Sequence, residues 1–169
     1  MTPPPLEDKI RGVDDLAAAL EPLRAQGKRV VQCHGVFDLL HPGHIRHFEA
    51  ARAEGDVLVV TVTPDRFVNK GPGRPVFNQR LRAESIAALQ SVDYVAVNEW
   101  PTAAEAIRRL KPAVYVKGSD YAEAGEDLTG KIVEERRAVE EHGGRIHFTA
   151  EITFSSSGLL NVHFDVYPE

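Results

Sequence analysis

The chain has 169 residues, of which 43% are hydrophobic and 27% charged, a composition typical of a folded globular protein rather than a disordered one. Its formal net charge of −5 argues against a broad nucleic-acid-binding surface, since non-specific affinity for a polyanion requires clustered Lys and Arg. The single cysteine excludes an intrachain disulfide, and the sequence has no long apolar run or signal-like N-terminus, so we expect a soluble, cytoplasmic protein.

Predicted helices and strands alternate along the chain. A Pro-rich tip and a leading helix over Val13–Ala25, which Pro22 would kink or divide, occupy residues 1–27. The apolar run at residues 57–62 is typical of a strand buried on both faces, as in parallel sheets. Strands are predicted at residues 29–33, 57–62, 94–97, 114–117 and 146–149, and the later helices near residues 44–54, 80–89, 102–110 and 131–142.

Five strands with helical crossovers predict an α/β fold: an open, mostly parallel five-stranded Rossmann-like sheet with helices on both faces. This domain is assigned to residues 28–160, and residues 161–169 to a C-terminal extension. In such sheets ligands bind beyond the carboxyl ends of the strands, where the strand order reverses. The segments that follow predicted strands at this edge are residues 34–44, 63–74, 117–121 and 155–157.

The first of these segments, His-Gly-Val-Phe-Asp-Leu-Leu-His-Pro-Gly-His at residues 34–44, carries the strongest signal. Gly35 can take backbone angles that a side chain would forbid, and Gly43 leaves room for a phosphate to approach the main chain. A helix beginning near His44 would aim unpaired N–H groups and the positive end of its dipole at an anion, with His41 and His44 beside it. The segment therefore predicts a phosphate-binding site.

Residues 35–44 match every fixed position of the signature Gly-x-Phe-Asp-x-x-His-x-Gly-His, and the chain thereby resembles the cytidylyltransferase-like nucleotidyltransferases. Residues 70–76, 92–95, 116–121 and 155–157 look like successive landmarks of the nucleotidyltransferase domain of the ADP-heptose synthases. The resemblance covers roughly residues 29–160, which is most of the chain, although the segment between Arg74 and Arg80 is shorter than in those enzymes. Residues 117–121 are closer to the ADP-heptose synthases than to glycerol-3-phosphate cytidylyltransferase. This similarity favours a sugar phosphate as the acceptor and ATP as the nucleotide.

The resemblance implies transfer of a nucleoside monophosphate from a nucleoside triphosphate to a sugar phosphate, with release of pyrophosphate. The site residues that it implies are His41, His44 and Lys70 for catalysis; Gly35, Val36, Phe37, Gly43, Lys117, Asp120, Ser155, Ser156 and Ser157 for nucleotide binding; and Asp38, Arg74 and Arg80 for substrate binding. Mg²⁺ is expected to arrive with the triphosphate and to need few protein ligands, so no metal-ligating residue is assigned.

The residue types suit this chemistry. A phosphomonoester is already a nucleophile at neutral pH, so positioning and charge neutralisation can supply the catalysis. The two histidines would donate to phosphate oxygens, and Lys70 is offered by a Gly-rich loop. The serines at residues 155–157 precede a predicted helix and combine hydroxyl donors with its N-terminus.

Other interpretations of the whole chain remain open. One is a CTP-dependent cytidylyltransferase that acts on a polyol or sugar phosphate. Two others are a catalytically silent nucleotide-binding module and a zinc module built on the histidines at positions 34, 41, 44 and 47.

Several residues also have structural interpretations. Asp38 can orient its loop, Lys117 and Asp120 can close a strand and a turn, and Arg82 and Glu84 can form an exposed helix face. Cys33 is predicted to be a small core residue. The resemblance further implies a homodimer and a fused or partner sugar-kinase domain, toward which residues 161–169 would begin a linker.

Overall fold

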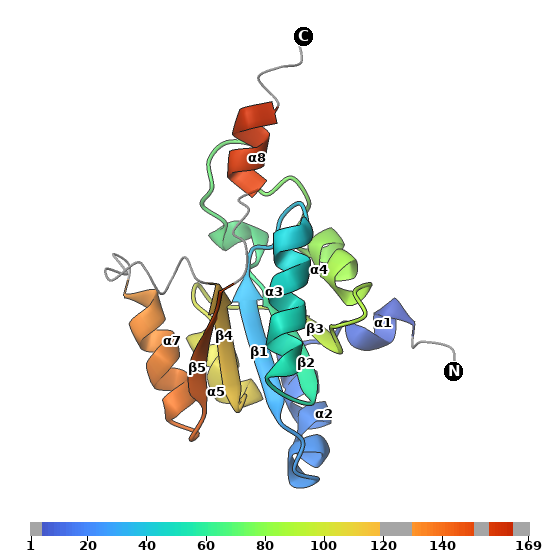
Figure 1. Cartoon of the computed structure of the whole chain (residues 1–169), viewed down its shortest axis with the longest axis vertical. Coiled ribbons are helices and arrows are strands. Elements are labelled where there is room, and N and C mark those ends of the chain that lie inside the picture. The colour runs from blue at the N-terminus through green and yellow to red at the C-terminus, as the bar shows by residue number, and fades with distance from the viewer. Residues whose placement is uncertain (1–4, 119–129, 151–155, 164–169) are drawn as a thin grey trace.

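The computed structural model describes residues 5–118, 130–150 and 156–163, and the structural statements below concern these residues. Five parallel strands form one sheet in the order β3-β2-β1-β4-β5, flanked by helices (Figure 1). The strands are β1 Val30–Gly35, β2 Val57–Val62, β3 Tyr94–Val97, β4 Val114–Gly118 and β5 Arg145–Thr149. The helices are α1 Leu6–Lys9, α2 Val13–Ala25, α3 Pro42–Ala53, η1 Asp65–Phe67, α4 Gln79–Ala87, α5 Ala104–Leu110, α7 Lys131–Glu140 and α8 Ser156–His163.

The predicted fold class is confirmed: the sheet is five-stranded, parallel and covered by helices. Pro22 does not divide the leading helix, because α2 runs through it to Ala25. The first strand extends to Gly35, whereas the sequence predicted that it would end two residues earlier, at Cys33. The short helices α1 and η1 were not predicted, since neither is long enough to show a helical period.

Alternate residues of β1 and β2 supply two cores, one on each face of the sheet. Cys33, Leu58 and Val60 pack with Phe48 of α3 and Ile86 of α4 on one face. Val30, Val57 and Val59 form the other core with α2 and α5. Both faces of β1 and β2 are therefore apolar, which is why their sequence is a continuous apolar run instead of an alternating one.

Cys33 lies in the middle of β1 with no exposed surface. Burial raises the pKa of its thiol far above the ordinary value, so the sulfur stays protonated at neutral pH. The side chain is a core residue, as the sequence predicted.

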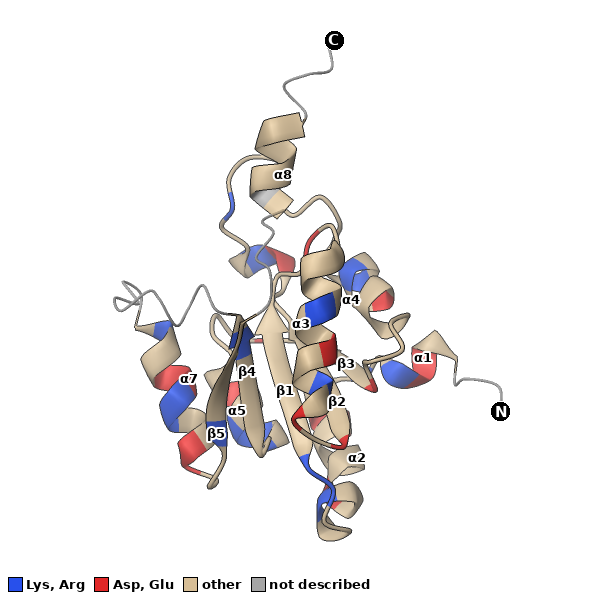
Figure 2. Cartoon of the chain, in the orientation of Figure 1, with Lys and Arg blue, Asp and Glu red and all other residues tan. Residues whose placement is uncertain are grey.

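Charged residues of both signs are interspersed along α3, α5 and α7 (Figure 2). No helix in the described part of the chain is long and apolar enough to cross a membrane.

The strand order places the reversal between β1 and β4, because β2 and β3 follow on one side of β1 and β4 and β5 lie on the other. The carboxyl ends of β1 and β4 therefore flank the position where ligands bind in such sheets. The segment 34–44 follows β1 at this edge.

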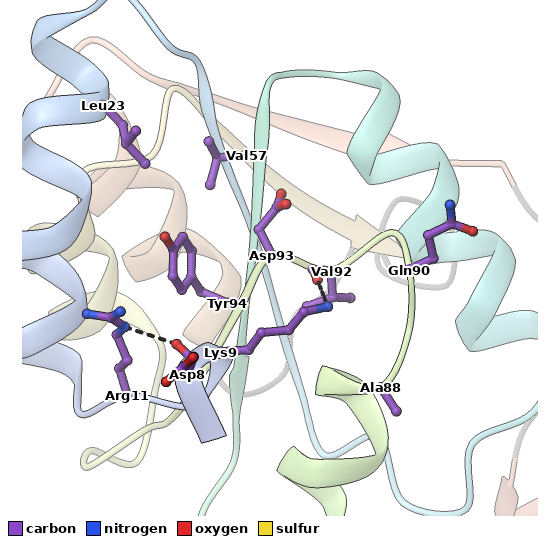
Figure 3. A pocket seen from close by; sticks show the side chains of 10 residues that line it. All are labelled: Asp8, Lys9, Arg11, Leu23, Val57, Ala88, Gln90, Val92, Asp93 and Tyr94. Atoms are coloured by element: carbon purple, nitrogen blue, oxygen red, sulfur yellow. Dashed lines mark hydrogen bonds between the residues drawn. The ribbon is translucent and has the colours of Figure 1, made fainter. Parts of the chain in front are cut away.

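A pocket lies at the opposite edge of the sheet (Figure 3). It is lined by Val57 and Tyr94, the first residues of β2 and β3, and by residues of α1. The Lys9 ammonium in its wall donates to the backbone oxygen of Val92 at 2.8 Å. The pocket is thus separate from the edge that carries the motif.

Candidate active site

His41 is the N-cap of α3 and turns its imidazole back onto the first turn of that helix. Its Nδ1 accepts a hydrogen bond from the Gly43 N–H at 3.1 Å, and Pro42 fills the first helical position, where no N–H is needed. The backbone oxygen of His41 accepts from the N–H groups of His44 at 3.0 Å and Ile45 at 3.3 Å. The expectation of unpaired N–H groups on a helix beginning near His44 is therefore wrong: α3 begins earlier, and its first N–H groups donate to His41.

The imidazoles of His41 and His44 stack, with ring centroids 3.8 Å apart and planes at 20°. Because Nδ1 of His41 is an acceptor, the neutral ring carries its proton on Nε2, which is then a donor. Nδ1 of His44 is buried and has no hydrogen-bond partner among the described residues. Burial lowers the pKa of both rings. The charge of Lys70, and those that His41 and His47 carry when protonated, help to bring the pKa of His44 to about 3. Both rings are therefore neutral at neutral pH.

The loop between β1 and α3 contains strained backbone. Phe37 and Leu39 adopt left-handed conformations, with φ of 50° and 52°, which are uncommon for large side chains. The Phe37 ring contacts the His44 ring edge-on, with the ring centroids 5.5 Å apart. A Cβ atom on residue 35 would lie only 2.9 Å from the Phe37 ring. Gly35 has no positive φ. It is needed for the space that it leaves to Phe37 and not, as the sequence suggested, for unusual backbone angles.

The carboxylate of Asp38 is buried and holds the loop that connects η1 to α4. Its Oδ2 accepts from Nε of Arg74 at 3.0 Å and from the N–H of Val76 at 2.7 Å, while Oδ1 accepts from the N–H of Phe77 at 3.1 Å. Burial raises the pKa of the carboxyl, but these donors outweigh it and hold the pKa below its ordinary value. Asp38 thus has the loop-orienting role, and its contact with a substrate stays a prediction.

Two more predicted residues come to the same edge. Lys70 precedes Gly71, which has a φ of 99°, and its positive charge is among the causes of the low pKa of His44. Burial lowers the pKa of Lys70 itself. Ser156, the first residue of α8, donates its hydroxyl to the backbone oxygen of Asp38 at 2.7 Å. Helix α8 is therefore attached to the loop of residues 36–41 between β1 and α3, the motif loop.

Arg82 is fully buried, with 1% of the residue exposed, so the predicted exposed position is wrong. Its guanidinium donates to the backbone oxygens of Phe77 at 2.9 Å, Val36 at 2.7 Å and Thr63 at 2.8 Å, and pairs with Asp65 at 2.6 Å. One side chain thus joins the three loops that follow β1, β2 and η1.

Arg80, the predicted substrate-binding residue, differs sharply from Arg82. Its side chain is 86% exposed and pairs with Glu84 on the surface of α4 at 3.0 Å. The spacing of apolar residues could have distinguished the two arginines. Arg82 lies four residues before Ile86, on the same face of α4, and that face is buried. Contact of Arg80 with a substrate stays a prediction.

The other histidines of the proposed zinc set are held by hydroxyl groups. His34 lies between Thr61 at 2.9 Å and Thr63 at 3.3 Å, and His47 is bound to Thr149 at 2.9 Å. Burial, together with the charge of nearby lysines, lowers the pKa of His34 to about 3 and that of His47 to about 4. In the described ranges no three His, Cys, Asp or Glu side chains are grouped to hold a metal ion. The zinc interpretation is not favoured.

Of the remaining nucleotide-binding predictions, Lys117 is the one whose side chain the structure describes. Lys117 is buried near the end of β4 and pairs with Glu135 of α7 at 3.2 Å. Asp120, Ser155 and the side chain of Ser157 lie outside the described residues.

The burial of Arg82 generates a first prediction. Arg82→Met removes the donor to three backbone oxygens and leaves Asp65 without its cation, so we expect the free energy of unfolding to fall by about 3–5 kcal/mol. Arg80→Met, a matched change on the exposed side of α4, should alter it by less than about 0.5 kcal/mol. Urea unfolding of both variants measures this, and equal effects would contradict the placement of the two arginines.

The buried histidines predict a pH dependence of stability. The folded-state pKa values of His34, His44 and His47 lie below the ordinary 6.5, so the unfolded chain binds more protons as the pH falls below that value. The free energy of unfolding should therefore decrease between pH 6.5 and pH 5 by roughly 1 kcal/mol per pH unit for each ring. His47→Gln should make this decrease shallower in urea titrations, whereas His142→Gln, at an exposed position, should leave it unchanged.

The sequence model of the cytidylyltransferase-like family matches residues 32–160. The chain is 42% identical over 167 residues to the bifunctional protein HldE of Geobacter metallireducens, covering 95% of this chain and 32% of that protein. With HldE of Methylobacillus flagellatus it shares 46% identity over 118 residues, or 69% of this chain and 24% of the relative. The chain thus spans about a third or less of the length of these relatives.

Solved structures agree. The lipopolysaccharide core biosynthesis protein from Thermoplasma volcanium GSS1 superposes with a TM-score of 0.62 at 26% identity, covering 75% of this chain and 100% of that one. Pantoate-beta-alanine ligase from Francisella tularensis, with a TM-score of 0.57, 14% identity and coverage of 93% and 78%, shares the fold. With the motif at the carboxyl edge of a parallel sheet and a family match over most of its length, this chain belongs to the cytidylyltransferase-like family of nucleotidyltransferases.

Proposed function

We propose that this chain transfers a nucleoside monophosphate from a nucleoside triphosphate to a sugar phosphate, as its resemblance to the ADP-heptose synthases implies. The observation that carries the proposal is the pair of neutral, stacked imidazoles of His41 and His44 at the start of α3, with Lys70 close enough to affect the pKa of His44. These groups lie at the carboxyl edge of the sheet, where ligands bind in parallel α/β folds.

The reaction needs little acid–base chemistry from the protein. An oxygen of the acceptor phosphate attacks the α-phosphorus, a new P–O bond forms, the bond from the α-phosphorus to the bridging oxygen breaks, and pyrophosphate leaves. The Nε2–H of His41 is a neutral donor whose direction is fixed by the bond between Nδ1 and Gly43, so it is suited to a phosphate oxygen that gains charge. Lys70 supplies a positive charge on a loop that Asp38 and Arg74 hold in place.

The triphosphate enters as its magnesium complex, with Mg²⁺ carried by phosphate oxygens. Residues 117–121, which resemble the ADP-heptose synthases, favour ATP. For binding we keep the predicted roles of Phe37, Gly43, Lys117 and Ser156.

The setting of the reaction follows from the same relatives. The HldE proteins are named bifunctional and are about three times as long as this chain or longer, which supports a fused or partner sugar-kinase domain. A homodimer and a cytoplasmic location complete the proposal.

Pyrophosphate release tests the activity directly. The chain would be incubated with Mg²⁺, each of the four ribonucleoside triphosphates and a panel of sugar 1-phosphates and polyol phosphates. We expect turnover with a sugar 1-phosphate, and a kcat/KM for ATP above that for CTP by roughly tenfold or more. Greater efficiency with CTP would reverse the nucleotide assignment, and no turnover with any pair would contradict the proposed activity.

The histidines give a sharper prediction. His41→Ala or His44→Ala should lower kcat by a factor on the order of 100 or more, because each removes an oriented donor from a site of developing charge. His142→Ala, at an exposed position in the turn after α7, is the matched control and should retain parental kcat. Thermal unfolding of each variant separates lost catalysis from lost folding, and folded variants with normal kcat would remove both rings from the mechanism.

A further inference from the structure

A buried ion pair lies beneath the carboxyl edge of the sheet, at the reversal between β1 and β4. The ammonium of Lys117 is 3.2 Å from Oε2 of Glu135, and the two side chains are only 8% and 4% exposed. Lys117 precedes the last residue of β4, which lies between β1 and β5, whereas Glu135 comes from α7. The pair thus connects a helix to the strand end beside the motif loop.

Glu135 is fixed by two further donors. The hydroxyl of Tyr115, itself fully buried, donates to Oε2 at 2.9 Å, and the N–H of Ala103 donates to Oε1 at 3.4 Å. The Lys117 ammonium also lies 5.6 Å from the centroid of the Tyr115 ring, within the range of a cation–π contact. The carboxylate is therefore a rigid acceptor that determines where the ammonium can lie.

The positive charge of Lys117 acts on two histidines near the motif. It contributes to the low pKa values of His34 at the end of β1 and of His47 on α3. The cation is thus held between elements that border the proposed nucleotide site.

Fold stability alone is a poor reason for this arrangement. The desolvation of two charges offsets much of their attraction, and apolar residues of similar volume commonly stabilise a core as well as a buried ion pair does. An apolar pair cannot present a cation at the ligand edge of a parallel sheet, whereas an ammonium is a common partner of phosphate groups.

We propose that Glu135 is a positioning residue, which through its ion pair holds the ammonium of Lys117 at the β1/β4 crevice for contact with the phosphate chain of the nucleoside triphosphate. This inference rests on the proposed function. Glu135 itself does not touch the nucleotide.

The proposal is tested by equilibrium binding of each Mg²⁺–nucleoside triphosphate to the whole chain, by calorimetry, together with thermal unfolding. Glu135→Gln keeps the shape of the side chain but removes its charge, so the ammonium loses its ion-pair partner and is drawn toward water. We expect the dissociation constant of the preferred nucleotide to rise at least fivefold, with the KM for the acceptor unchanged. Glu140→Gln makes the same chemical change at an exposed position of α7 and should change neither.

A double variant, Lys117→Met with Glu135→Leu, separates positioning from packing and also decides the question if Glu135→Gln fails to fold. It leaves no unpaired charge, so its melting temperature should stay near that of the parent, while nucleotide binding should weaken at least tenfold. Parental affinity in either variant would overturn the inference. If the parent chain itself binds none of the four nucleotides, the proposed function fails instead, so the two failures are distinguishable.

Discussion

The carboxylate of Asp38 is the constraint on which the geometry of the edge depends. It lies between two left-handed residues, Phe37 and Leu39, and accepts three hydrogen bonds from residues 74–77. Backbone strain of this kind persists only where the surroundings over-determine it, and a buried carboxylate with three donors has that effect. The same residue receives Ser156 through its backbone oxygen, so three separate parts of the chain meet at one position.

Arg82 complements Asp38 from the opposite side of the loops. The Asp38 carboxylate accepts hydrogen bonds from backbone N–H groups and from the guanidinium of Arg74. The guanidinium of Arg82 donates to the carbonyl oxygens of Val36, Thr63 and Phe77. Loop backbone that leaves a sheet has no ladder partners, and buried polar groups must be paired. Two buried, oppositely charged side chains therefore replace the missing secondary structure around the motif.

Much of the fold could be predicted because it follows from local patterns. The continuous apolar run of β2 and the helical period of α3 each report burial within a few residues of sequence. The edge that carries the motif follows from strand direction alone. The contacts of Asp38 with residues 74–77 could not be predicted in this way, since they join positions more than thirty residues apart.

The site shows the same division. From residue types the sequence predicted a phosphate site at His41 and His44. It could not predict the N-cap bond that fixes the His41 proton or the burial that keeps both rings neutral. A local signal was available for Arg82, which lies four residues before Ile86 on the apolar face of α4. The resemblance instead assigned substrate binding to Arg80, whose side chain is exposed on the surface of α4.

Because Cys33 is buried in the core, the reactivity of its thiol can report local opening of the core. It is the single thiol of 169 residues, lies under Phe48 and Ala51 of α3, and is two residues from Gly35. A thiol reagent can reach it only when α3 separates from β1, so the labelling rate under native conditions measures that local unfolding equilibrium. Because His41 is the N-cap of α3, a ligand bound at the start of this helix should slow the labelling. Ligand binding at the carboxyl edge would then be coupled to the stability of the core.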